Sequence, residues 1–96
     1  RVEAGRWLCY KALWARDQGM RHTLDSALAK SYGNVVAFEA INDALQWFGA
    51  FGYTLDCPLE MGLRGVRSYM LAEGSTEVMK IILARELLGK DFIAYR

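Results

Sequence analysis

The residues best placed to do chemistry lie in one run, Glu73-Gly74-Ser75-Thr76-Glu77, directly before an apolar helical pattern. A carboxylate at such a point lies beside backbone N–H groups that a helix leaves unpaired in its first turn. The hydroxyls of Ser75 and Thr76, with the helix dipole, can hold an anion or a phosphate there. The same residues also make an ordinary helix cap. The local pattern leaves both interpretations open.

A second run, residues 46–53, places an amide at the end of a long helical pattern and follows it with small residues. Gly49 and Gly52 would let another backbone or a flat ligand approach closely. Glycine-rich helix ends are common, so this run alone does not identify a site.

Other catalytic templates are absent from the sequence, since it has no GxSxG, P-loop, GxGxxG or HExxH motif. His22 is the only histidine, and we expect it to be solvated beside a helix start. Cys9 and Cys57 belong to no CxxC pair. They are too few for a disulfide framework and are expected to be reduced and buried. We therefore predict no metal site.

The composition predicts one folded domain, because 96 residues with 53% hydrophobic and 24% charged side chains suit a globular core. The formal net charge is +1 and the basic residues are dispersed, which argues against a nucleic-acid partner. No apolar run reaches the roughly 18–20 residues that span a bilayer.

Helical spacing of apolar residues predicts a first helix over residues 2–18 and a long, central one over 24–48 with Thr23 as its N-cap. Gly33 should permit close backbone approach. The first helix also carries an aromatic stripe at helical spacing, made of Trp7, Tyr10 and Trp14. The stripe is either part of a wide core face or a surface for an element that this chain lacks.

The second half of the chain predicts shorter elements. A turn over residues 49–56 precedes a short helix that starts at Pro58 and ends near Gly62 or Gly65. An irregular connection with some helical character follows over residues 64–72.

A last helix runs from a Ser75 cap to Gly89, before a tail from Lys90 to Arg96. Arg85 interrupts its apolar stripe, either by reaching toward solvent or by pairing with a carboxylate. The fold class is all-α, an antiparallel helical bundle in one domain over residues 1–96.

Taken in order, these runs resemble the carboxy-terminal part of the acyl-CoA dehydrogenase family. The usual pattern there is Q-x-x-G-G-x-G-Y, then P-x-E-R, R-D and Y-E-G-T, and finally a helix that ends in A-R. Order and spacing match over about half of this chain, at residues 46–53, Cys57-Pro58-Leu59-Glu60, Arg64, Arg67, residues 73–78 and Ala84-Arg85.

The resemblance implies a role for each matching residue. Glu73 would be the general base that removes the proton α to a thioester carbonyl, while a hydride from Cβ passes to a flavin, FAD. Gly74 would contact the substrate. The FAD of the adjacent subunit would be held by Gln46, Trp47, Phe48, Gly49 and Ala50. The residues that match further FAD contacts are Ser75, Thr76 and Glu77.

The resemblance also implies the wider setting. The substrate would be an acyl-CoA, the acceptor an electron-transfer flavoprotein, the assembly a homodimer or homotetramer, and the location a bacterial cytoplasm or a mitochondrial matrix. The chain would be part of a longer multidomain enzyme and lack the first helix of the bundle. By itself it should be inactive and self-associate. The alternatives are a flavin oxidase or monooxygenase relative and a non-catalytic helical oligomerisation module.

The sequence departs from the family pattern at five positions: Ala50 for the second glycine, Met61 for arginine, Gly65 for aspartate, Ala72 for an aromatic residue and Ser75 for threonine. The changes at Met61 and Gly65 predict the loss of an ion pair. Ala72 and Ser75 predict a different pocket lining beside Glu73.

Overall fold

The chain is built from five helices in the computed structural model, which describes residues 1–89 and 91. They are α1 (Val2–Asp17), α2 (Thr23–Phe48), α3 (Ala50–Tyr53), α4 (Pro58–Tyr69) and α5 (Thr76–Leu88). The described residues include no strand. The all-α prediction is thus confirmed, while most of the predicted tail from Lys90 to Arg96 lies outside the described residues.

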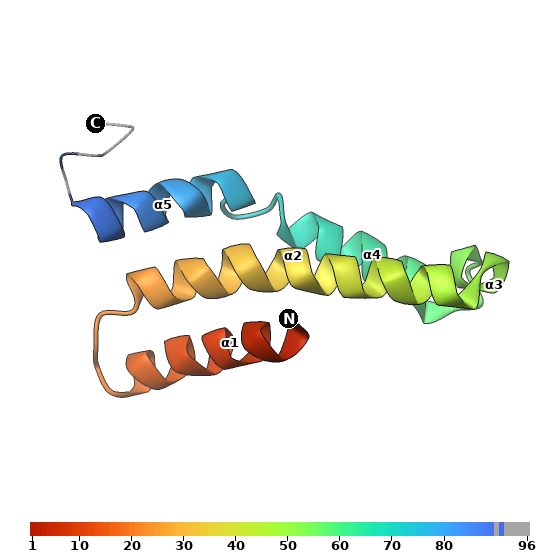
Figure 1. Cartoon of the computed structure of the whole chain (residues 1–96), viewed down its shortest axis with the longest axis horizontal. Helices are drawn as coiled ribbons and strands as arrows, with labels where there is room; N and C mark the ends of the chain where they lie inside the picture. Colours follow the sequence, from red (N-terminus) through yellow and green to blue (C-terminus); the bar gives the residue numbers. More distant parts are fainter. Residues whose placement is uncertain (90, 92–96) are drawn as a thin grey trace.

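Helix α2 is the axis of the molecule (Figure 1). Helices α1 and α5 lie along its amino-terminal half, and α4 lies along its carboxy-terminal half. All three run opposite to α2, so the antiparallel arrangement is confirmed. Within the described part of the chain, α1, α4 and α5 pack on α2 and not on one another. The result is an open, elongated bundle measuring 49 × 30 × 19 Å.

Helix α1 packs against α2 through small residues. Gly5, Ala12 and Ala15 are the buried residues of α1. A β-carbon on Gly5 would lie 3.6 Å from the Cα of Gly33, which confirms the close backbone approach expected there. Because small residues make this contact, the aromatic stripe of α1 points elsewhere. Trp7 is 63% exposed, so the stripe is not part of a core face within this chain.

The start of α2 differs from the prediction. Thr23 lies inside the first turn, and His22 occupies the N-cap position without a side-chain cap. The carbonyl of His22 accepts the first helical hydrogen bond, from the N–H of Ser26 at 2.8 Å. The His22 Nδ1 atom also lies 3.0 Å from the Ser26 hydroxyl, and the residue is half-buried, so it is only partly solvated. The local pattern predicted the start of α2 to within one residue, but the N-cap prediction of Thr23 was wrong.

Helix α4 is longer than predicted. It runs through Gly62 and Gly65 to Tyr69, so most of the stretch predicted as irregular is helical. A β-carbon on Gly62 would lie 3.7 Å from the Cδ1 atom of Ile41 on α2. Packing on α2 thus offsets the cost of about 1 kcal/mol that an interior glycine imposes on a helix. The predicted turn over residues 49–56 likewise contains the single helical turn α3.

Helix α5 begins and ends as predicted. The Ser75 hydroxyl accepts a hydrogen bond from the N–H of Val78 at 3.2 Å, and Gly89 follows the helix with φ 100°. The Arg85 Nη2 atom lies 3.9 Å from the Glu86 Oε1 atom, and the Arg85 side chain is 41% exposed, so Arg85 forms a long ion pair with a carboxylate and also reaches solvent.

The two cysteines differ in environment. Cys57 is buried, as predicted, but Cys9 is exposed. The expectation of burial is therefore wrong for Cys9, because α1 buries its small residues and leaves its neighbouring positions uncovered.

Candidate functional site

The connection from α4 to α5 has an unusual backbone at Glu73. This residue has φ 53°, and it is the one non-glycine residue with positive φ among residues 1–89 and 91. The left-handed region costs an ordinary residue about 1–2 kcal/mol. Gly74 follows with φ 102°. Non-glycine residues held in this region often belong to functional sites.

Lys30 on α2 holds this connection in place. Its Nζ atom donates hydrogen bonds to the carbonyl oxygens of Ala72 at 2.7 Å, Glu73 at 2.9 Å and Gly74 at 2.8 Å. An ammonium group has three N–H donors, so all of them are used on three successive carbonyls. Bonds from a charged donor are also stronger than neutral ones. One helical turn further along α2, Asn34 donates to the carbonyl of Tyr69 at 3.2 Å.

The Glu73 side chain is exposed, and within the described residues its carboxylate makes no hydrogen bond or ion pair. The residue borders a hollow of about 290 Å³ between α2 and α5, where Ala27, Lys30, Met79 and Ile82 also contribute to the wall. The backbone of Glu73 is thus fixed while its carboxylate is free to meet a group from outside this chain.

The residues after Glu73 begin α5. The Ser75 hydroxyl serves as the helix cap, and the N–H of Thr76 donates to the carbonyl of Met70 at 3.2 Å. Two of the first N–H groups of α5, those of Thr76 and Val78, therefore have partners inside the chain. The structure confirms the Ser75 cap, and the five consecutive residues from Glu73 to Glu77 form the end of the connection and the start of α5.

The other predicted contact segment lies at the far end of α2. Gln46, Trp47, Phe48, Gly49 and Ala50 are all exposed, and Trp47 is 89% exposed. Gln46 lies sixteen positions after Lys30 in the same helix, which is about 24 Å at 1.5 Å per residue. The structure does not bring this segment and Glu73 into one site of the same chain.

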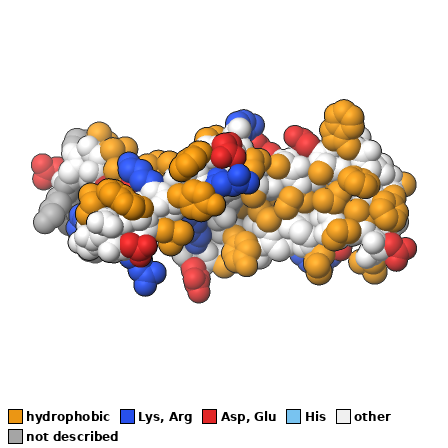
Figure 2. All heavy atoms as spheres, turned by 90° about the horizontal axis from the view of Figure 1, so that it is seen from below, with side chains coloured by type: hydrophobic (Ala, Val, Ile, Leu, Met, Phe, Trp, Pro, Cys, Tyr) orange, Lys and Arg blue, Asp and Glu red, His pale blue; other side chains and the backbone are white. Residues whose placement is uncertain are grey.

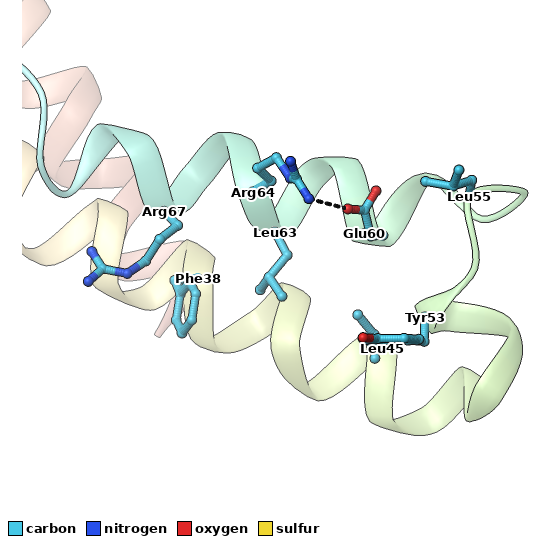
Figure 3. Close-up of a pocket in the computed structure, with 8 residues that line it drawn as sticks. All are labelled: Phe38, Leu45, Tyr53, Leu55, Glu60, Leu63, Arg64 and Arg67. Atoms are coloured by element: carbon cyan, nitrogen blue, oxygen red, sulfur yellow. Dashed lines mark ion pairs between the residues drawn. The ribbon is translucent and has the colours of Figure 1, made fainter.

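A wider hollow, of about 580 Å³, lies beside that far segment, between α2 and α4 (Figure 3). Phe38, Leu45 and Leu63 line it, and Arg64 pairs there with Glu60 at 3.3 Å. Met61 and Gly65 carry no charge, so they cannot form the ion pair that the family pattern would give. Glu60 has an arginine partner all the same, which is Arg64. The hollow has no counterpart in the sequence prediction, because its lining comes from residues far apart in the chain.

The described residues contain no group of three or more histidine, cysteine, aspartate and glutamate side chains that could hold a metal ion. In the same part of the chain, no helix is both long and apolar enough to cross a membrane.

Comparison with known families places most of this chain in one family. Residues 1–88 match the family described as acyl-CoA dehydrogenase, C-terminal domain. The chain belongs to the acyl-CoA dehydrogenase family. Its relatives include the short-chain specific acyl-CoA dehydrogenase of Clostridium acetobutylicum, which is 35% identical over 90% of this chain and 23% of the relative. Glutaryl-CoA dehydrogenase of Desulfococcus multivorans is 37% identical over 92% of this chain and 23% of its own length.

Solved structures of the acyl-CoA dehydrogenase family share the fold. Butyryl-CoA dehydrogenase from Megasphaera elsdenii matches with a TM-score of 0.87 and 34% identity, over 90% of this chain and 22% of that chain. A chain in the structure described as the electron transferring flavoprotein of Acidaminococcus fermentans matches with a TM-score of 0.87 and 38% identity, over 90% of this chain and 23% of that chain. The chain thus spans less than a quarter of the length of the relatives it matches.

Two features of the site were not found from the sequence. Lys30 was missed because nothing in a helical pattern shows that an ammonium group meets carbonyls 42 to 44 residues later. The left-handed backbone of Glu73 was missed because the residue type does not favour it. Gly74 directly after Glu73 was the one local signal of an unusual backbone.

Proposed function

We propose that this chain is the carboxy-terminal helical domain of an FAD-dependent acyl-CoA dehydrogenase, which forms the α,β double bond of an acyl-CoA thioester. Residues 1–96 would form one domain of a longer, multidomain enzyme, in a bacterial cytoplasm or a mitochondrial matrix. The observation that supports this most is the exposed Glu73 carboxylate on a left-handed backbone that Lys30 fastens to α2.

Glu73 would act as the general base. Its carboxylate would take the proton from the carbon α to the thioester carbonyl, and Gly74 would contact the substrate beside it. A base works well when it is held within hydrogen-bond reach of the proton it removes. The fixed backbone at residues 72–74 supplies that constraint.

The residues present fit an FAD cofactor, which when bound would accept the hydride that leaves Cβ. Gly74 has φ 102°, and a β-carbon there would lie 2.6 Å from the Cε atom of Met79, so a side chain at this position would be strained and would crowd Met79. At the start of α5, Glu77 is exposed and Ser75 and Thr76 are half-exposed, so these three residues would be accessible for contact with the flavin.

A second FAD surface would lie at the far end of α2. There Gln46, Trp47, Phe48, Gly49 and Ala50 are exposed and would hold the FAD of the adjacent subunit. The separation of about 24 Å along α2 supports this division, because one chain then contributes to two sites. Such sharing requires a homodimer or homotetramer. An electron-transfer flavoprotein would accept the electrons.

The test is Glu73→Gln in the full-length protein, which removes the base and keeps the size of the side chain. We expect acyl-CoA to bleach the flavin absorbance about 10²–10⁴-fold more slowly, since general-base catalysis contributes a factor of this size. Flavin content should stay at the wild-type level. The matched control is Glu3→Gln, which alters an exposed carboxylate on α1 that pairs only with Arg6 in the described residues. Bleaching by Glu73→Gln at the wild-type rate would show that Glu73 is not the base.

A further inference from the structure

We propose that Lys30 is a positioning residue for Glu73, an inference that rests on the proposed function. It acts through the backbone of residues 72–74, whose three carbonyl oxygens it binds from a neighbouring helix. The ammonium group sets the direction in which the Glu73 carboxylate leaves the chain.

The contacts of Lys30 differ from those of an ordinary surface lysine. Among the described residues it forms no ion pair with a carboxylate, and its three donors all go to backbone oxygens. The residue is half-buried beside Met79, in the hollow that Glu73 borders. Burying a charge is costly unless it is hydrogen-bonded. The three short bonds satisfy the ammonium group completely, so the lysine has one stable arrangement in this place.

The bonds explain how Glu73 keeps an unfavourable backbone. The left-handed region costs about 1–2 kcal/mol, and such strain persists only when the surroundings fix it. Lys30 fixes the peptide groups on both sides of Glu73 and the next one. Without the ammonium group, the connection would relax toward commoner conformations and the carboxylate would move. A displacement of about 1 Å can reduce catalysis by roughly 10²-fold.

Asn34 provides a matched comparison on the same helix. It ties α2 to the point where the connection begins, through the carbonyl of Tyr69, which is the last residue of α4 and lies four residues before Glu73. Its removal should weaken the packing of that connection and leave the backbone of Glu73 and Gly74 in place. The Asn34 variant therefore distinguishes a general loosening of the connection from a specific displacement of the Glu73 carboxylate.

The experiment uses the full-length, flavin-loaded enzyme with Lys30→Met, Lys30→Arg and Asn34→Ala. For Lys30→Met we expect kcat to fall by about 10²-fold and KM for an acyl-CoA to change by less than about threefold, as when an interaction matters in the transition state. Lys30→Arg keeps charged donors, which make stronger hydrogen bonds than neutral ones, and should recover at least about tenfold of that loss. Asn34→Ala should change kcat by less than about threefold. If Lys30→Met does not fold, Lys30→Gln keeps two donors and should show an intermediate loss.

A double-mutant cycle separates positioning from general damage. In a Glu73→Gln background, Lys30→Met should change the residual rate by less than about threefold, because there is no base left to position. An equal loss in both backgrounds, or an equal loss from Asn34→Ala, would overturn the proposal. So would a wild-type kcat for Lys30→Met in an enzyme that Glu73→Gln inactivates. A Glu73→Gln enzyme with wild-type kcat would instead overturn the proposed function itself.

Discussion

Glu73 and Gly74 together form a turn that neither residue could form alone at low cost. Glu73 has φ 53° and Gly74 has φ 102°, so the chain passes through two left-handed positions before α5 begins. The glycine bears the second position freely, whereas the glutamate depends on its carbonyl contact with Lys30. The turn therefore depends on the strained backbone of Glu73, the conformational freedom of Gly74 and the hydrogen bonds from Lys30.

The first prediction follows from the geometry of Gly74. A β-carbon there would lie 2.6 Å from the Met79 Cε atom, on a backbone that disfavours side chains. We expect Gly74→Ala to lower the free energy of unfolding by about 1–3 kcal/mol, measured by urea denaturation of this chain. Gly65→Ala is the control, because nothing lies within 4 Å of its β-carbon position in α4. The control should be neutral or stabilising by up to about 1 kcal/mol. Equal stability of the Gly74→Ala and wild-type chains would contradict this geometry.

At the scale of elements, the sequence predicted helices wherever apolar periodicity and cap chemistry agreed. The Ser75 cap and the Gly89 end of α5 were found because the local residues determine them. The end of α4 was not found, since the contact of Gly62 with Ile41 depends on residues 21 positions apart. The candidate site shows the same division. The matching motifs identified Glu73 and its neighbours, but its support by Lys30 arises only when α2 lies beside the connection.

An ion pair links the loop after α1 to α5 and carries the second prediction. The Arg21 guanidinium lies 2.6 Å from the Glu86 carboxylate, and its hydrogen bond lowers the pKa of that carboxyl below the ordinary value of 4.5. A lowered folded-state pKa stabilises the fold above pH 4.5, and the stabilisation is lost as pH falls through the folded-state pKa. The effect should be small, because Arg21 is exposed to solvent.

We expect Glu86→Gln to lower the urea midpoint at pH 7 and to match the wild type once pH falls below the folded-state pKa. Arg21→Gln removes the same pair and should show the same convergence. A difference between Glu86→Gln and wild type that stays constant with pH would contradict the assignment.

The whole molecule leaves large apolar surfaces uncovered. Figure 2 shows hydrophobic side chains gathered over the face of α1 and at the far end of α2 and α3. The aromatic stripe of α1 is more than half exposed, at Trp7, Tyr10 and Trp14. Large contiguous apolar patches on a protein surface mark sites that bind protein, membrane or ligand, or surfaces that aggregate. In this open bundle α1, α4 and α5 each pack on α2 alone among the long helices. Their faces that point away from α2 are exposed.

The third prediction is that the 96-residue chain alone self-associates through the α1 stripe. Sedimentation velocity over a wide concentration range should show a weight-average sedimentation coefficient that rises above the value for the monomer as the concentration increases. Replacing Trp7 and Trp14 together by glutamine should reduce the association and leave the helix content unchanged, because both side chains are exposed. A single monomeric species at every concentration would contradict the prediction.

Removal of the α-proton by Glu73 can be measured directly, apart from hydride transfer. The full-length enzyme is incubated with an acyl-CoA in D₂O without an electron acceptor, and deuterium at the α-carbon is measured by mass spectrometry. The wild type should exchange this proton, and Glu73→Gln should do so about 10²–10⁴-fold more slowly. Exchange by Glu73→Gln at the wild-type rate would contradict the central claim.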